Sequence, residues 1–145
     1  ESALRQGTPV TCAMIDIDKF KSVNDKYGHS VGDAVLREVA QLMKSSVRKS
    51  DVVARFGGEE FCMYMNGMSE EHAGEYFDKL RQKISDAIIR AEEHSLKVTV
   101  SIGLCSNIEH DINNMIEAAD KGLYQAKETG RNRVIHHSKL IDGYQ

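Results

Sequence analysis

The chain has 145 residues, of which 41% are hydrophobic and 28% charged, with a formal net charge of −3. This size fits one domain with a core large enough to need neither disulfides nor a structural metal. The acidic balance excludes a general electrostatic binder of nucleic acid or of a membrane surface, so any polyanion must be bound locally by metal ions or a few basic residues.

The hydrophobic pattern also limits where the protein acts. No stretch approaches the roughly 18 apolar residues that a membrane span needs, and no signal peptide is visible. Three cysteines, Cys12, Cys62 and Cys105, lie in apolar runs without paired spacing, which is typical of reduced thiols in a core. We therefore expect a cytoplasmic domain without direct membrane insertion, although the full-length protein can still be anchored to a membrane.

Apolar periodicity predicts alternating strands and helices along the chain. The order predicts an α/β fold: a sandwich with a central mixed β-sheet and helices packed on its faces, in which the Gly57-Gly58 hairpin supplies the antiparallel part. In chain order the expected elements are a strand over 10–16, a short helix over 20–27 closed by Gly28, a helix over about 31–48, a hairpin of 52–56 and 61–65, a helix capped by Ser69 and running toward residue 94, a strand over 98–104, a helix capped by Asp111 and ended by Gly130, and a strand over 133–136.

Acidic residues occur at two places where the predicted sheet could bind a ligand. Asp16 ends the first strand and Asp18 follows two residues later; ligands collect at the carboxyl ends of strands in open α/β sheets. Alternatively, this pair is a helix N-cap and a solvated acid. Glu59-Glu60 follow the glycine turn, and the flanking Phe56 and Phe61 indicate that the hairpin tip lies against the body of the domain. Together the two sites could hold one or two hard cations through oxygen ligands.

Basic residues end the last long helix, in the segment Lys127-Glu-Thr-Gly-Arg131. The simplest interpretation is that they complement the negative end of the helix dipole. Beside a metal site, the same pair could hold nucleotide phosphates.

Taken together, these motifs resemble the GGDEF domains of diguanylate cyclases, in a Gly-Gly-Glu-Glu-Phe form. The resemblance runs from about Thr8 to Val134 and keeps the expected order of motifs. It is carried by Asp16-Ile-Asp-Lys-Phe-Lys-Ser-Val-Asn24-Asp, Tyr27-Gly-His-Ser-Val-Gly-Asp33, Arg55-Phe-Gly-Gly-Glu-Glu-Phe61, Val100-Ser-Ile-Gly103, Ala119-Asp120 and Tyr124-Gln-Ala-Lys127 through Gly130-Arg131-Asn132.

The resemblance implies a palm-like fold, similar to nucleotide cyclases and the polymerase palm, and a set of site residues. Asp16 and Glu59 would be the metal carboxylates, assisted by the Ile17 carbonyl, and Glu60 would support the metal or activate the attacking hydroxyl. The metals would be two Mg²⁺ (or Mn²⁺) ions per active site. The remaining implied contacts are Asn24 and Asp33 with the guanine edge, and the backbone around Phe20 with Lys21, Lys127 and Arg131 on the phosphates.

The implied activity is condensation of two GTP into cyclic di-GMP and two pyrophosphates. The 3′-hydroxyl of one GTP would attack the α-phosphorus of the other, and two cations would stabilise the attacking and leaving oxygens. Since each domain would hold one GTP, catalysis would require a two-fold homodimer. We also expect an attached sensory or receiver domain, and no nucleic-acid partner.

Arg48-Lys-Ser-Asp51 precedes the glycine turn and resembles the family's Arg-x-x-Asp site for product inhibition, where cyclic di-GMP binds away from the active centre. The alternative is an ordinary surface pair between a helix end and a loop, which would contribute little.

Two further expectations qualify the resemblance. Residues 1–145 form a single catalytic domain, but nothing in residues 1–7 resembles the family's Asp-x-Leu-Thr-x-Leu-x-Asn-Arg leader, so we expect that segment to be missing. The alternative functions are a degenerate domain that acts as a receptor or allosteric module for GTP or cyclic di-GMP, and a plain interaction domain with solvated acids. Binding without turnover would indicate the first, and failure to bind GTP the second.

Overall fold

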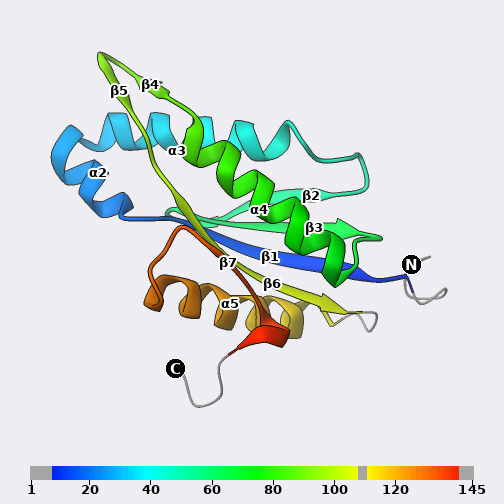
Figure 1. Cartoon of the computed structure of the whole chain (residues 1–145). Coiled ribbons are helices and arrows are strands. Elements are labelled where there is room, and N and C mark those ends of the chain that lie inside the picture. Colours follow the sequence, from blue (N-terminus) through cyan, green and yellow to red (C-terminus); the bar gives the residue numbers. More distant parts are fainter. Residues whose placement is uncertain (1–7, 108–110, 141–145) are drawn as a thin grey trace.

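A five-stranded mixed sheet forms the centre of the computed structural model, which describes residues 8–107 and 111–140 (Figure 1). The expectation that a leader segment is missing concerns residues 1–7, which lie outside this range. The spatial order is β2-β3-β1-β6-β7, and only β6 and β7 pair in parallel. The predicted mixed sheet is confirmed, but antiparallel pairing extends beyond the hairpin to the whole centre of the sheet. The strands are β1 (Val10–Ile17), β2 (Val52–Gly57), β3 (Glu60–Asn66), β6 (Val100–Asn107) and β7 (Val134–His136).

Helices cover both faces of this sheet, as the sequence predicts (Figure 1). One face carries the larger core, beneath α3 (His29–Lys44) and α4 (Glu70–Asp86), with α2 (Phe20–Tyr27) beside α3. The other face carries a smaller core beneath α5 (Ile112–Glu128). All eight residues of β1 are buried, which explains the continuous apolar run that predicted this strand.

Local signals placed most helix ends correctly. The side chains of Ser69 and Asp111 accept hydrogen bonds from the backbone N–H groups of His72 and Asn114, both at 3.3 Å, and so cap α4 and α5 as expected. Gly28 follows α2 with a φ of 95°, a conformation that favours glycine.

Two helices are shorter than predicted. α3 ends at Lys44 because the hydroxyls of Ser45 and Ser46 donate to the carbonyls of Leu42 and Met43, which competes with further helical bonds. α4 ends at Asp86 instead of continuing toward residue 94. The following segment forms a small hairpin of β4 (Ile89–Ala91) and β5 (His94–Leu96), which buries apolar side chains in the larger core.

The cysteines are free thiols, with Cys12 and Cys105 buried and Cys62 half-buried. Across the two described segments, 8–107 and 111–140, the helices are all too short or too polar to cross a membrane.

Strand β6 and helix α5 approach each other closely at two glycines. A Cβ on Gly103 would lie 2.0 Å from the Ala119 carbonyl oxygen and 2.1 Å from the Leu123 nitrogen. A Cβ on Gly122 would lie 2.7 Å from the carbonyl oxygen of Ile135 on β7. The backbone of α5 therefore rests directly on the sheet, and this contact sets the position of residues at the end of α5.

We predict that Gly103→Ala lowers the free energy of unfolding by about 1–3 kcal/mol, because the new methyl group would collide with backbone that cannot move away alone. Gly74→Ala is the control, since a Cβ there meets nothing within 4 Å. That change inside α4 should stabilise the protein by about 0.5–1 kcal/mol. Urea unfolding curves measure both values, and equal stability of the two variants would contradict the close packing.

Candidate active site

Asp16 lies at the carboxyl end of the central strand and is only 3% exposed. It is in register with Glu60 on β3 and Ser101 on β6, so the neighbouring strands bring a second carboxylate beside it. Its carboxylate forms an ion pair with the Lys127 ammonium from α5. Burial raises the pKa of Asp16 to about 6; Lys127 opposes this shift, and the negative charges of Glu59 and Glu60 add to it.

The acidic pair of the hairpin lies next to this carboxylate. The Ile17 N–H donates to the Glu59 carbonyl oxygen at 3.3 Å, which ties the start of β3 to the end of β1. Burial and the charge of Asp120 raise the pKa of Glu60, against the lowering effect of Lys127. Several acids thus share one basic partner, an arrangement that favours an additional cation.

Asp120 is part of this charge cluster, although the sequence analysis gave it no role. It lies on α5 seven residues before Lys127. That separation is about two helical turns and puts both residues on the same helix face. The spacing was therefore visible in the sequence.

The glycine turn places the acids as expected, but its two aromatic neighbours differ. Gly58 has a φ of 49°, and its carbonyl oxygen accepts a bond from Arg55 Nε at 2.9 Å. Phe61 is buried in the core, whereas Phe56 is 54% exposed. The inference that the hairpin tip lies against the body because aromatic residues flank it therefore holds on the Phe61 side only. On the other side, a bulge between Arg55 and Gly57 shifts the strand register at Phe56.

The predicted guanine residues flank the junction between α2 and α3. Asn24 Oδ1 is buried and has no hydrogen-bond partner among the described residues. A Cβ on Gly32 would lie 1.9 Å from this oxygen, so only glycine leaves room for the Asn24 carboxamide. Asp33 follows on the exposed side of α3. A buried acceptor without a donor is costly, and a ligand with N–H groups would satisfy it.

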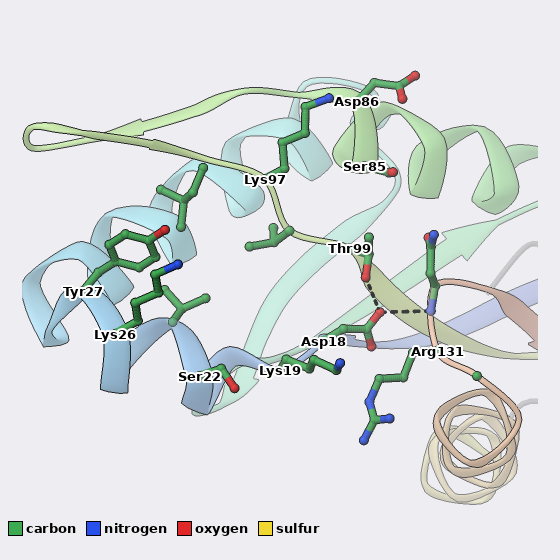
Figure 2. Close-up of a pocket in the computed structure, with 15 residues that line it drawn as sticks. Asp18, Lys19, Ser22, Lys26, Tyr27, Ser85, Asp86, Lys97, Thr99 and Arg131 are labelled. Carbon is green, nitrogen blue, oxygen red and sulfur yellow. Dashed lines mark hydrogen bonds between the residues drawn. The ribbon is translucent and has the colours of Figure 1, made fainter.

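The predicted phosphate residues do not all meet. Phe20 is buried at the start of α2 and next to Gly32. Lys21 is exposed and pairs with Asp25 on its own helix at 3.0 Å. Lys127 contacts Asp16, whereas Arg131 lies beyond α5 and lines a cavity of about 780 Å³ (Figure 2).

The alternative interpretation of Asp16 and Asp18, as a helix N-cap and a solvated acid, is wrong. Asp18 is 7% exposed, and it does not cap α2, whose N-cap residue is Lys19 with no side-chain cap bond. Asp16 is buried as well, so neither acid of the pair is solvated.

Arg48 and Asp51 form a local clip at the other end of β3 from Glu60. Two Arg48 nitrogens donate to the Asp51 carboxylate at 3.2 and 3.1 Å, and Arg48 also donates to the Asn66 carbonyl oxygen. Burial alone would raise the pKa of Asp51, but the bonds and charge of Arg48 bring it below the usual value. This pair closes the loop between α3 and β2.

The site fits a cation that is bound only partly by protein. Among the residues that the structure describes, no group of three His, Cys, Asp or Glu side chains is arranged to hold a metal. Mg²⁺, however, is commonly bound by one or two carboxylates together with water and substrate phosphates. Asp16, Glu59 and the Ile17 carbonyl meet this smaller requirement.

Comparison with known proteins identifies the family. The profile described as "Diguanylate cyclase, GGDEF domain" matches residues 1–133, and the chain belongs to this family. Diguanylate cyclase A of Treponema denticola is 44% identical over 123 residues, which cover 83% of this chain and 33% of that protein.

Solved structures show the same fold. The GGDEF domain of DgcB from Caulobacter crescentus, solved with c-di-GMP, has a TM-score of 0.89 at 32% identity and covers 95% of this chain and 81% of its own. The active GGEEF domain of a diguanylate cyclase from Vibrio cholerae has a TM-score of 0.86 at 33% identity, covering 96% and 89%. The predicted palm-like α/β fold is thereby confirmed. The chain spans about a third of the length of the curated relatives it matches.

The raised pKa of Asp16 predicts how magnesium affects stability at different pH. With a folded pKa of about 6 against 3.8 in the ordinary state, the folded chain binds more protons than the unfolded one between these values. This contribution to stability is therefore present at low pH and is lost as the pH rises through 6. Magnesium needs the ionised carboxylate, so its affinity should fall about tenfold per pH unit below 6.

We expect Mg²⁺ at about 10 mM, a concentration suited to a weak site, to raise the Tm more at pH 7.5 than at pH 5. At pH 5 the ion must displace a proton from Asp16. Thermal unfolding of the parent and of Asp16→Asn at both pH values measures this. The variant should lose the difference, and an equal magnesium effect in the two proteins would show that Asp16 does not bind the ion.

Proposed function

We propose that this chain is a diguanylate cyclase catalytic domain, which condenses two GTP into cyclic di-GMP and two pyrophosphates. The observation that carries the proposal is the buried Asp16 carboxylate beside Glu59 and Glu60, with Lys127 as its basic partner. These residues belong to the motifs that resemble the GGDEF family, and relatives in that family are named diguanylate cyclases.

The reaction needs a nucleophile to be deprotonated and a leaving group to be neutralised. The 3′-oxygen of one GTP forms a bond to the α-phosphorus of the other, and the bond from that phosphorus to pyrophosphate breaks; a second such step closes the ring. Glu60, with a pKa raised by burial and by Asp120, suits the acceptance of the hydroxyl proton. Basic residues compensate the charge on the leaving pyrophosphate.

Asp16, Glu59 and the Ile17 carbonyl would hold Mg²⁺ or Mn²⁺. Two such ions, when bound, would stabilise the attacking and leaving oxygens of the displacement. Lys127 forms an ion pair with Asp16. When Asp16 holds a metal ion, the Lys127 ammonium would be available to phosphate oxygens. Lys21, Arg131 and the backbone at Phe20 would bind the same phosphates.

Recognition of guanine is supported by the unpartnered acceptor of Asn24. Guanine presents N–H donors at N1 and at its 2-amino group, and Asn24 Oδ1 and the Asp33 carboxylate are acceptors. Adenine lacks both of these donors, so the buried acceptor would stay unsatisfied, which costs about 1–3 kcal/mol. This difference favours GTP over ATP.

Catalysis then requires two copies of the chain. Each domain holds one GTP, and the two α-phosphates and 3′-hydroxyls face each other only in a two-fold homodimer. We propose that a sensory or receiver domain in the rest of the protein controls this dimer.

Glu59→Ala should reduce turnover at least a hundredfold in an artificially dimerised chain, because a carboxylate for the metal is lost. The fold should persist, since Glu59 lies at a turn and its backbone contact to Ile17 remains. Glu38→Ala, an exposed acid on α3, is the matched control and should keep parental activity. Chromatographic measurement of cyclic di-GMP decides, and unchanged turnover in Glu59→Ala would refute the metal role.

We further propose that Arg48 and Asp51 bind cyclic di-GMP as an inhibitory site. Arg48→Ala should raise the inhibitory concentration of added cyclic di-GMP by about tenfold or more, as expected for the loss of charge-assisted bonds. It should also lower the Tm slightly, because Asp51 loses its ion pair. Lys49→Ala, which removes a neighbouring exposed cation, should change neither. Equal inhibition of parent and Arg48→Ala would leave the clip a structural feature only.

A further inference from the structure

The carboxylate of Asp18 is a buried convergence point for three hydrogen-bond donors. Ser101 Oγ donates to Oδ1 and Thr99 Oγ1 to Oδ2, both at 2.6 Å. The backbone N–H of Asn132 donates to Oδ2 at 3.0 Å, from the segment between α5 and β7. Figure 2 shows these bonds to Thr99 and to that segment in the wall of the cavity. A carboxylate suits this position, because both of its oxygens accept hydrogen bonds and neither donates.

The segment held by Asp18 has an unfavourable backbone. Arg131 and Asn132 have φ values of 63° and 48°, in the left-handed region. Asparagine adopts this conformation fairly readily, whereas arginine rarely does. Such a conformation persists only when surrounding contacts hold it, and it often marks a functional position. The Arg131 N–H also bonds to the Ala126 carbonyl at 2.9 Å, which ties the segment to the last turns of α5.

A second tether holds the same segment from α4. Arg81 on α4 donates from Nη1 to the Asn132 side-chain oxygen at 2.8 Å. Its Nε bonds to Asp78 at 2.9 Å, which orients the guanidinium. Asn132 is therefore fixed through its backbone by Asp18, in the turn after β1, and through its side chain by α4.

We propose that Asp18 is a positioning residue: it holds the Gly130–Asn132 segment that carries Arg131, and so sets the contribution of Arg131 to the affinity for the triphosphate. This inference rests on the proposed function, in which Arg131 binds phosphate. Asp18 acts through Asn132 and not through the metal, because its oxygens already accept three protein donors. Arg81 supports the same position.

The charge of Asp18 makes the proposal sharply testable. Removing a negative charge from beside Arg131 should, by Coulomb's law alone, strengthen the binding of a polyanion to that residue. Positioning predicts the opposite for Asp18→Asn, because a neutral amide has one acceptor oxygen in place of two and holds the Asn132 N–H less strongly than a carboxylate does. Asp86→Asn is the matched control: it removes the same charge from an exposed residue of the same cavity.

The experiment measures binding of guanosine 5′-(α,β-methylene)triphosphate with Mg²⁺ to the 145-residue chain by calorimetry, since this analogue cannot release pyrophosphate. Asp18→Asn should raise the Kd about tenfold, whereas Asp86→Asn should leave it unchanged or lower it. In an Arg131→Ala background, Asp18→Asn should change the Kd less than twofold, because the group it positions is already absent.

Three outcomes would overturn the proposal. One is binding by Asp18→Asn that is equal to or tighter than that of the parent. Another is an equal loss in both backgrounds, which would indicate a general structural role. The third is a changed magnesium dependence without a change in nucleotide affinity, which would make Asp18 a metal ligand. A parent chain that does not bind the analogue would refute the proposed function itself, and with it this role.

Arg81→Met provides a second test if Asp18→Asn does not fold. It removes the other tether while leaving the buried carboxylate and its three donors in place. The expected result is a Kd about threefold higher in the parent background and unchanged in the Arg131→Ala background. An unaltered Kd in the parent background would contradict the tethering of Arg131.

Discussion

The burial of a carboxylate at the end of the central strand is the constraint on which the rest of the site depends. A charge removed from water is costly unless it is paired or its pKa shifts, and Asp16 does both, with Lys127 as its partner and a pKa of about 6. Its neighbours Glu59 and Glu60 increase the cost. Because this cluster of buried acids costs stability, its presence favours a functional role in which a cation completes the site.

The sheet explains how residues distant in sequence meet around this carboxylate. β1 lies between β3 and β6, so the hairpin acids and the start of β6 are brought to the same end of the strand. Gly103 and Gly122 let α5 pack directly on the other face, which places Lys127 over Asp16. Asp18 then connects this end of the sheet to the segment after α5. The proposed metal, base and phosphate positions are thus all set by contacts to one strand end.

Much of the fold could be predicted because its signals are local: the apolar run of β1, the caps Ser69 and Asp111, and the glycine turn all act over a few residues. The end of α4 could not, because the apolar spacing after Ile84 fits a helix, and only packing into the larger core makes it a hairpin. The role of Asp18 was also beyond local pattern, since its three donors lie 81, 83 and 114 residues away in sequence.

The measurement that tests the account most directly is magnesium-dependent formation of cyclic di-GMP from GTP by the chain alone and by the chain fused to a dimerising coiled coil. The account predicts product from the fused form at low protein concentration, and little from the unfused chain under the same conditions. GTP binding by the fused chain without any product, in the presence of Mg²⁺ or Mn²⁺, would contradict catalysis by this domain and would make it a nucleotide receptor.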